Sequence, residues 1–233
     1  MLKELKKAVW EIIYKIPSSA ILLFHHITDN PSVCKSGCKL SYDKFTDIIE
    51  SFNNYADLNS VIGKPSQRQI AVTFDDGLKD VYEIAYPFLK ERSIPFTVFI
   101  ATDFLDMPGY ITTENLKEMS SDNLVTIGSH GVTHKNLNTL SDLQKKSELT
   151  ESKIIIEKII GKPINFFAFS HGQYDKNTIK QMSIYSYGFT VDSYPLNCIT
   201  ARNSKLLPRI NIENESFDVA KKKLLKIFRG KKK

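Results

Sequence analysis

The chain has 233 residues, of which 42% are apolar and 25% charged, enough for one large α/β domain with its own core. The net charge of +6 lies largely near the two ends, and no basic stripe with interleaved aromatic residues indicates a nucleic-acid-binding protein. No apolar stretch is long enough to span a bilayer. Three cysteines are too few for a disulfide framework, and we expect Cys34, Cys38 and Cys198 to be free thiols, as in a reducing compartment.

Residues 1–17 are predicted to form an amphipathic helix, with leucine, valine and isoleucine on one face, lysines on the other, and Pro17 at its end. Glu11 and Lys15 interrupt the apolar stretch, so it is not typical of a secretion signal. The helix could pack on the domain or on a partner, or it could lie on a membrane surface. We therefore expect a cytoplasmic protein, with peripheral contact at the inner membrane face as the open alternative.

The rest of the chain alternates between two kinds of pattern. Apolar runs predict strands at residues 20–26, 70–74, 94–101, 124–130, 164–170, 187–191 and 206–211. Amphipathic patterns predict helices at residues 41–54, 78–92, 112–121, 141–161, 175–186 and 216–228. Because no linker or repeat interrupts the alternation, residues 18–230 should form one domain with a mainly parallel sheet, followed by a basic tail at 231–233. The sheet could close into a barrel or stay open and doubly wound.

Two acids, Asp75 and Asp76, follow the predicted strand at residues 70–74 directly. Neighbouring carboxylates repel one another unless a cation or a catalytic task uses them. The carboxyl ends of parallel strands are where α/β folds place their chemistry. A polar turn in which one aspartate caps the following helix is the alternative.

All five histidines fall at or just after the ends of predicted strands. His25 and His26 end the first strand, His130 and His134 stand in "GSHGVTH", and His171 follows the strand at 164–170. A His-x3-His pair with one carboxylate can bind a divalent metal ion, most commonly zinc, although manganese, cobalt or iron also fit. The second aspartate could then act as the base on a metal-activated water, and His25 is the candidate for the acid.

The motifs "ILLFHHI", "TFDDG", "SHGVTH", "FFAFSHGQYD" and "LLPRIN", in this order, resemble the polysaccharide deacetylase (NodB-homology) family, and within it the permuted branch of exopolysaccharide N-deacetylases. The resemblance runs from about Ala20 to Ile212. It implies a distorted (β/α)7 barrel that removes N-acetyl groups from sugars with the help of a metal ion.

Residue by residue, the resemblance implies that Asp75 is the general base and that Asp76, His130 and His134 bind the metal ion. His25 matches the histidine of the "LMYHRV"-like segment, which acts as the general acid in that branch. His26 stands where that segment often has arginine, and we expect it near the substrate or in a structural role.

The third motif departs from the family pattern. Ser170 and His171 replace the Pro-Tyr pair of the more usual "FAYPYG". The family uses the backbone amide at the tyrosine position to bind the oxyanion, and the N–H of His171 could keep that role. Arg209, in "LLPRIN", could form a bidentate ion pair with Asp75 or could bond to a nearby carbonyl.

The sequence thus predicts a metal-dependent N-deacetylase whose partner is a carbohydrate: an N-acetylated amino sugar in a polysaccharide, oligosaccharide or glycan precursor. Nucleic acid is not an expected partner, and membrane contact would run through residues 1–17. Two alternatives stay open. One is a catalytically silent barrel that binds a glycan or a partner, and the other is a metal hydrolase of a small non-sugar amide.

Overall fold

The computed structural model describes residues 16–30, 38–214 and 217–229. The expected N-terminal helix at 1–17, apart from its last two positions, and the basic tail at 231–233 lie outside this range. Within the described residues, no helix combines the length and the apolar character needed to cross a membrane.

Seven strands form one parallel sheet in the order β8-β7-β6-β5-β4-β1-β9. They are β1 (Ala20–Phe24), β4 (Ile70–Phe74), β5 (Phe96–Ile100), β6 (Val125–Ser129), β7 (Phe166–Ala168), β8 (Tyr187–Phe189) and β9 (Ile210–Asn211). Each pair of neighbouring strands in this sheet is parallel, as expected for strands joined by helical crossovers.

The two edges of the sheet meet through the segment that leads into β9. Leu207 donates its N–H to the carbonyl of Gly188 in β8 over 2.8 Å, and its own carbonyl accepts the N–H of Thr190 over 2.9 Å. Three residues later Ile210 pairs with Leu22 in β1. One short stretch of chain therefore contacts both edge strands, and the sheet curls into the expected distorted (β/α)7 barrel.

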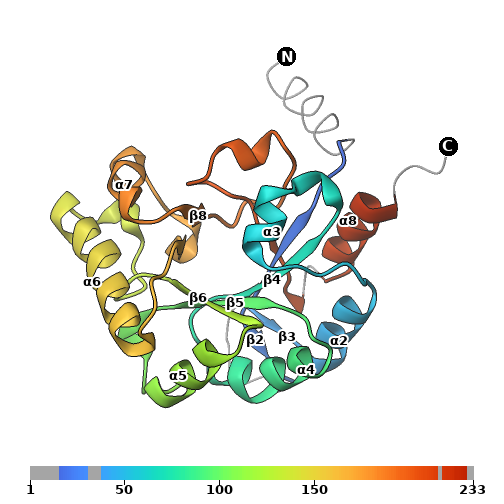
Figure 1. Ribbon diagram of the computed structural model, residues 1–233, viewed down its shortest axis with the longest axis horizontal. Coiled ribbons are helices and arrows are strands. Elements are labelled where there is room, and N and C mark those ends of the chain that lie inside the picture. Colours follow the sequence, from blue (N-terminus) through green and yellow to red (C-terminus); the bar gives the residue numbers. More distant parts are fainter. Residues whose placement is uncertain (1–15, 31–37, 215–216, 230–233) are drawn as a thin grey trace.

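Helices surround the sheet (Figure 1). They are α2 (Tyr42–Glu50), α3 (Leu58–Gly63), α4 (Tyr86–Glu91), α5 (Thr113–Ser121), α6 (Asp142–Ile160), α7 (Lys176–Gln181) and α8 (Phe217–Arg229). The helices α5 and α6 begin after Thr112 and Ser141, each of which forms a capping box. Gly161 ends α6 in a left-handed conformation with φ of 67°.

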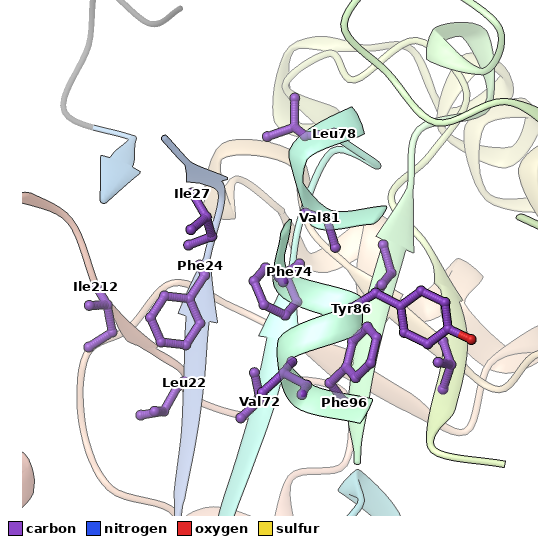
Figure 2. Packing of buried hydrophobic residues seen from close by; sticks show 14 of the residues in the cluster. Leu22, Phe24, Ile27, Val72, Phe74, Leu78, Val81, Tyr86, Phe96 and Ile212 are labelled. Atoms are coloured by element: carbon purple, nitrogen blue, oxygen red, sulfur yellow. The ribbon is translucent and has the colours of Figure 1, made fainter. Parts of the chain in front are cut away.

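The core between strands and helices is built from aromatic rings on β1, β4 and β5 (Figure 2). Phe74 lies at its centre, with ring centroids 5.6 Å from Phe24 and 5.8 Å from Phe96. The other face of the same strands is also buried, where Ile21 and Ala71 line the inside of the barrel. Burial on both faces explains why these strands read as continuous apolar runs rather than as alternating patterns.

Several element boundaries differ from the prediction. β1 ends at Phe24, and His26–Ile27 forms a separate strand, β2, which pairs with β3 (Lys39–Leu40). The helix expected at 78–92 begins one residue later, at Lys79, and contains a π-helical turn (Val81–Ala85) before α4. Helix α3 was not predicted, because six residues carry too short a periodic pattern to stand out.

The expectation of free thiols holds for Cys198, which is free and exposed, but is wrong for Cys38. Cys38 is disulfide-bonded, and Cys34 lies outside the described residues. The spacing of the cysteines alone did not reveal this bond.

Phe74→Ala should lower the free energy of unfolding by about 3–5 kcal/mol, because it removes a fully buried ring from between Phe24 and Phe96. Urea unfolding followed by circular dichroism measures the change. Leu143→Ala is the control, since Leu143 is 79% exposed and its loss should cost little. Equal effects from both variants would contradict the central place of Phe74 in the core.

Candidate active site

The acidic pair stands at the end of β4, where the backbone turns sharply. Asp75 still follows the strand, and its N–H donates to the carbonyl of Phe24 over 3.1 Å. Asp76 and Gly77 then adopt left-handed conformations with φ of 73° and 70°. This conformation is uncommon for aspartate, and such strain is concentrated at functional sites. The turn lets two adjacent acids point to different partners.

Asp76, His130 and His134 lie close enough together to hold one metal ion. Their candidate ligand atoms all fall within 4.8 Å of one another. Oδ1 of Asp76 lies 3.1 Å from Nε2 of His134 and 3.4 Å from Nε2 of His130. The residues come from the ends of β4 and β6, so the sheet brings together positions that are more than 50 residues apart in the sequence.

The hydrogen bonds of His130 show that this cluster suits a cation. Its Nδ1 lies 2.8 Å from the carbonyl oxygen of Ala168, which can only accept, so Nδ1 carries the proton. In the neutral ring the lone pair of Nε2 then faces the carboxylate of Asp76. Oδ1 of Asp76 is buried, and no hydrogen bond within the described part of the chain satisfies it. Acceptors that converge in this way need a cation between them, and the trio is consistent with a divalent metal site.

Asp75 is paired with Arg209, and both side chains are almost completely buried. The guanidinium donates from its two terminal nitrogens to Oδ1 and Oδ2 of Asp75 over 2.6 and 2.7 Å. Its Nε also donates to the carbonyl of Thr190 over 3.0 Å, so the two alternatives for Arg209 are both realised. Burial would raise the pKa of Asp75, but Arg209 and His130 outweigh it and lower the pKa, which keeps the carboxylate charged.

His25 follows β1 and is half-buried beside the acidic pair. Its Nδ1 is buried, and the described residues offer it no hydrogen-bond partner. Burial lowers the pKa of His25, against the influence of Asp75 and Asp76, both of which raise it. The pKa of the ring therefore responds to both carboxylates, and its Nδ1 has no hydrogen-bond partner among the described residues.

His171 lies beside the metal-ligand candidates, with its ring centroid 4.5 Å from that of His134. Its backbone is left-handed with φ of 54°. The hydrogen bonds of this turn use the amides of Gly172 and Gln173, which donate to the carbonyls of Phe169 and Ser170, and not the amide of His171. Ser170, the other departure from the family pattern, donates its hydroxyl to the carbonyl of His130 over 3.0 Å.

His26 has a separate partner. Its Nδ1 lies 2.7 Å from Oδ2 of Asp80, near the start of the π-helical turn. The five strand-end histidines therefore do not act as one group, and the structure gives His26 an ion-pairing partner outside the cluster.

Three residues near the cluster were not singled out from the sequence. The ring of Phe104 lies 5.7 Å from that of His134, and Tyr110 packs against Phe104 at 4.6 Å. Burial and the charge of Asp76 both raise the pKa of Tyr110. Glu148, on α6, bonds to the loop between His130 and His134. No motif signals these residues, because each comes from a part of the chain distant from the acids and histidines.

Comparisons with known proteins agree with this geometry. The family model described as polysaccharide deacetylase matches residues 62–191, more than half of the chain. A Bacillus subtilis (strain 168) protein, YxkH, is 31% identical over 132 residues, which cover 57% of this chain and 47% of that protein. The poly-beta-1,6-N-acetyl-D-glucosamine N-deacetylase of Staphylococcus aureus (strain MRSA252) is 30% identical over 172 residues, or 67% of this chain and 58% of that protein. The chain thus spans about half the length of these relatives.

Among solved structures, the fold is similar to that of the Streptococcus pyogenes deacetylase PplD in complex with acetate. The TM-score is 0.77 at 21% identity, over 90% of this chain and 97% of that one. IcaB from Ammonifex degensii gives a TM-score of 0.75 at 17% identity, over 89% of this chain and 97% of that one. These similarities establish the barrel fold.

His134→Ala should abolish tight binding of a divalent ion, because it removes one of the three converging ligands. Metal content after dialysis against zinc, measured by plasma mass spectrometry, checks this. His26→Ala is the matched control, since it removes a histidine that pairs with Asp80 instead. A His134→Ala protein that keeps its zinc would refute the ligand set.

Metal affinity should fall as the pH is lowered through the neutral range. Burial lowers the pKa of His130, but Asp75 and Asp76 outweigh it and raise the pKa, so this ring holds a proton more tightly than an ordinary histidine. A metal ion and a proton compete for the same nitrogen, and acid therefore favours release. Zinc titrations between pH 5 and 8, in about half-unit steps, measure the trend. An affinity that does not vary over this range would contradict histidine ligation.

Proposed function

The chain belongs to the polysaccharide deacetylase family of carbon-nitrogen hydrolases, and we propose that it removes acetyl groups from an N-acetylated amino sugar in a polysaccharide, oligosaccharide or glycan precursor. The observation that carries the proposal is the charged, buried Asp75 held next to the Asp76–His130–His134 cluster. The name of the Staphylococcus aureus relative supports the sugar class.

We assign the cluster to one divalent ion, with zinc as the first choice and manganese, cobalt or iron as alternatives. Oδ1 of Asp76 and the Nε2 atoms of His130 and His134 would hold it. Once bound, such an ion supplies a Lewis acid that polarises a carbonyl and lowers the pKa of water. The neighbouring residues provide the proton transfers.

Asp75 is proposed as the general base. Arg209 keeps Asp75 ionised and holds both of its oxygens. In this proposal the carboxylate takes a proton from a water molecule on the side that Arg209 does not occupy. The water oxygen that loses this proton forms a bond to the acetamide carbon. Arg209 itself acts through Asp75 and is a positioning residue in this scheme.

His25 and His171 are proposed to complete the reaction. The backbone N–H of His171 would donate to the oxygen that becomes negative in the tetrahedral state. His25 would give a proton to the nitrogen as the carbon–nitrogen bond breaks. Burial lowers the pKa of His25 although both nearby carboxylates raise it, so its protonated ring gives up a proton more readily than an ordinary histidine. The products are acetate and a free amino sugar.

A cytoplasmic location with contact at the inner membrane face through residues 1–17 remains a proposal. Of these residues, 1–15 lie outside the described part of the chain. The disulfide at Cys38 removes the free-thiol argument for a reducing compartment.

Asp75→Asn should lower the rate of acetate release from N-acetylglucosamine oligomers by about 10²–10⁴-fold, because an amide cannot take the proton. Zinc content should stay unchanged, since Asp75 is not among the proposed ligands. Asp47→Asn is the control, because Asp47 is also paired with a cation, Lys221, but on the outer helices. Full activity in Asp75→Asn would show that the base is misassigned.

The parent protein distinguishes the rival functions in the same assay. Chelator-sensitive release of acetate from the oligomers supports the deacetylase. Release from small acetamides alone would favour a non-sugar amide hydrolase. Binding of the oligomers without any release would favour a silent glycan-binding barrel.

A further inference from the structure

We propose that Glu148 on α6 is a positioning residue for the metal ligands, which holds the loop between His130 and His134 in the geometry that lets both rings reach one ion. The inference rests on the proposed metal site. It adds a residue that belongs to no part of the acid–histidine cluster and acts from the outer layer of the barrel.

The carboxylate of Glu148 accepts hydrogen bonds from the residues at the centre of this loop. Oε2 accepts the backbone N–H of Val132 over 2.6 Å and that of Thr133 over 3.0 Å. Oε1 accepts the hydroxyl of Thr133 over 2.5 Å. Glu148 is 6% exposed, so water does not replace these bonds easily. Hydrogen bonds to a carboxylate are among the stronger ones in proteins, and here three of them converge on a loop of three residues.

Three further backbone groups of the loop are held by other elements. The carbonyls of Gly131 and Val132 accept the amides of Thr102 and Asp103 over 3.1 and 3.0 Å. The N–H of Gly131 donates to Oγ of Ser129 over 3.1 Å. Glu148 is thus the acceptor on which the two successive amides of Val132 and Thr133 depend. Its loss would leave both amides, which are partly buried, without this acceptor, and an unmade hydrogen bond of this kind destabilises the loop.

The close approach of Glu148 also accounts for the glycine in "HGVTH". Gly131 has φ of 85°, and a Cβ atom there would lie 2.8 Å from Oε2 of Glu148. That distance is too short for a side chain, so the glycine makes room for the carboxylate. The loop therefore packs closely against α6, without space for a side chain at Gly131.

Helix α6 offers a rigid support for this contact. Oγ of Ser152, one turn after Glu148, donates to the carbonyl of Glu148 over 2.6 Å and lies 2.7 Å from Oγ of Ser129 at the end of β6. The hydroxyl of Tyr185 donates to the carbonyl of Leu149 over 2.9 Å. The helix is therefore bonded to the strand just before His130 and to the loop just after it. A displacement of the loop would change the separation of the two ring nitrogens, on which chelation depends.

Glu148→Gln tests the inference, because it keeps the size of the side chain but turns one acceptor oxygen into a donor that faces other donors. The zinc dissociation constant should rise by about 10–100-fold, the usual effect of removing a group that orients a metal ligand. Competition with a chromophoric chelator measures it, and thermal unfolding of the chelator-treated protein reports stability. Glu157→Gln is the matched control, since Glu157 lies on the same helix and accepts the N–H of Ile164 over 2.8 Å, away from the site.

Both glutamine variants should lose some stability, but only Glu148→Gln should lose zinc affinity. If both bind zinc as the parent does, Glu148 is merely structural and the inference is overturned. Thr133→Val and Thr133→Ser decide the matter should Glu148→Gln fail to fold. Weaker zinc binding in Thr133→Val that Thr133→Ser restores supports the inference, and parent-like affinity in Thr133→Val overturns it. A parent protein that binds no zinc would instead refute the proposed metal site, and this inference with it.

Discussion

Arg209 reaches the buried carboxylate of Asp75 from the same segment of chain that closes the barrel. Two residues before Arg209, Leu207 bonds to β8, and one residue after it, Ile210 pairs with β1. Burying a carboxylate costs several kcal/mol unless a well-placed partner compensates, and the two bonds from Arg209 provide that compensation. Closure of the barrel and ionisation of Asp75 are therefore coupled: without the closing segment, the proposed base would lose the cation that keeps it charged.

Different partners compensate the negative charges of the two adjacent acids. Asp75 remains in strand geometry and meets a fixed guanidinium, whereas Asp76 enters a left-handed turn and meets two histidines. The charge of an arginine is permanent, so Arg209 lowers the pKa of Asp75 and keeps its carboxylate ionised until it takes up a proton. The cluster around Asp76 is consistent with a site for a divalent cation, which can be exchanged. Asp75 therefore has a permanent partner, and Asp76 stays available for an ion. The proposed base and the proposed metal ligand are thus different residues, as a base next to a metal requires.

The sequence predicted those features that depend on residues close together in the chain or on strand ends. The alternation of patterns predicted one mainly parallel sheet, and the family resemblance specified a barrel. The positions after strands predicted a cluster of histidines with one aspartate, and the resemblance specified that aspartate as Asp76. Glu148, Phe104 and Tyr110 could not be found in this way, because their contacts with the site exist only once α6 and the loop after β5 fold over it. His26 was expected near the substrate or in a structural role, and the fold pairs this ring with Asp80, which fits the structural alternative. The boundary error at the end of β1 and the unpredicted π-helical turn both arise where backbone hydrogen bonding, and not side-chain pattern, determines the geometry.

The central claim is that Asp76, His130 and His134 converge because a cation belongs between them. Anomalous diffraction at the zinc absorption edge, from crystals grown with about one equivalent of zinc, tests it most directly. The account predicts one strong peak within bonding distance, about 2.0–2.2 Å, of Oδ1 of Asp76 and of both Nε2 atoms, with Nδ1 of His130 still on the carbonyl of Ala168. A peak elsewhere in the molecule, with these three side chains free of metal, would contradict it.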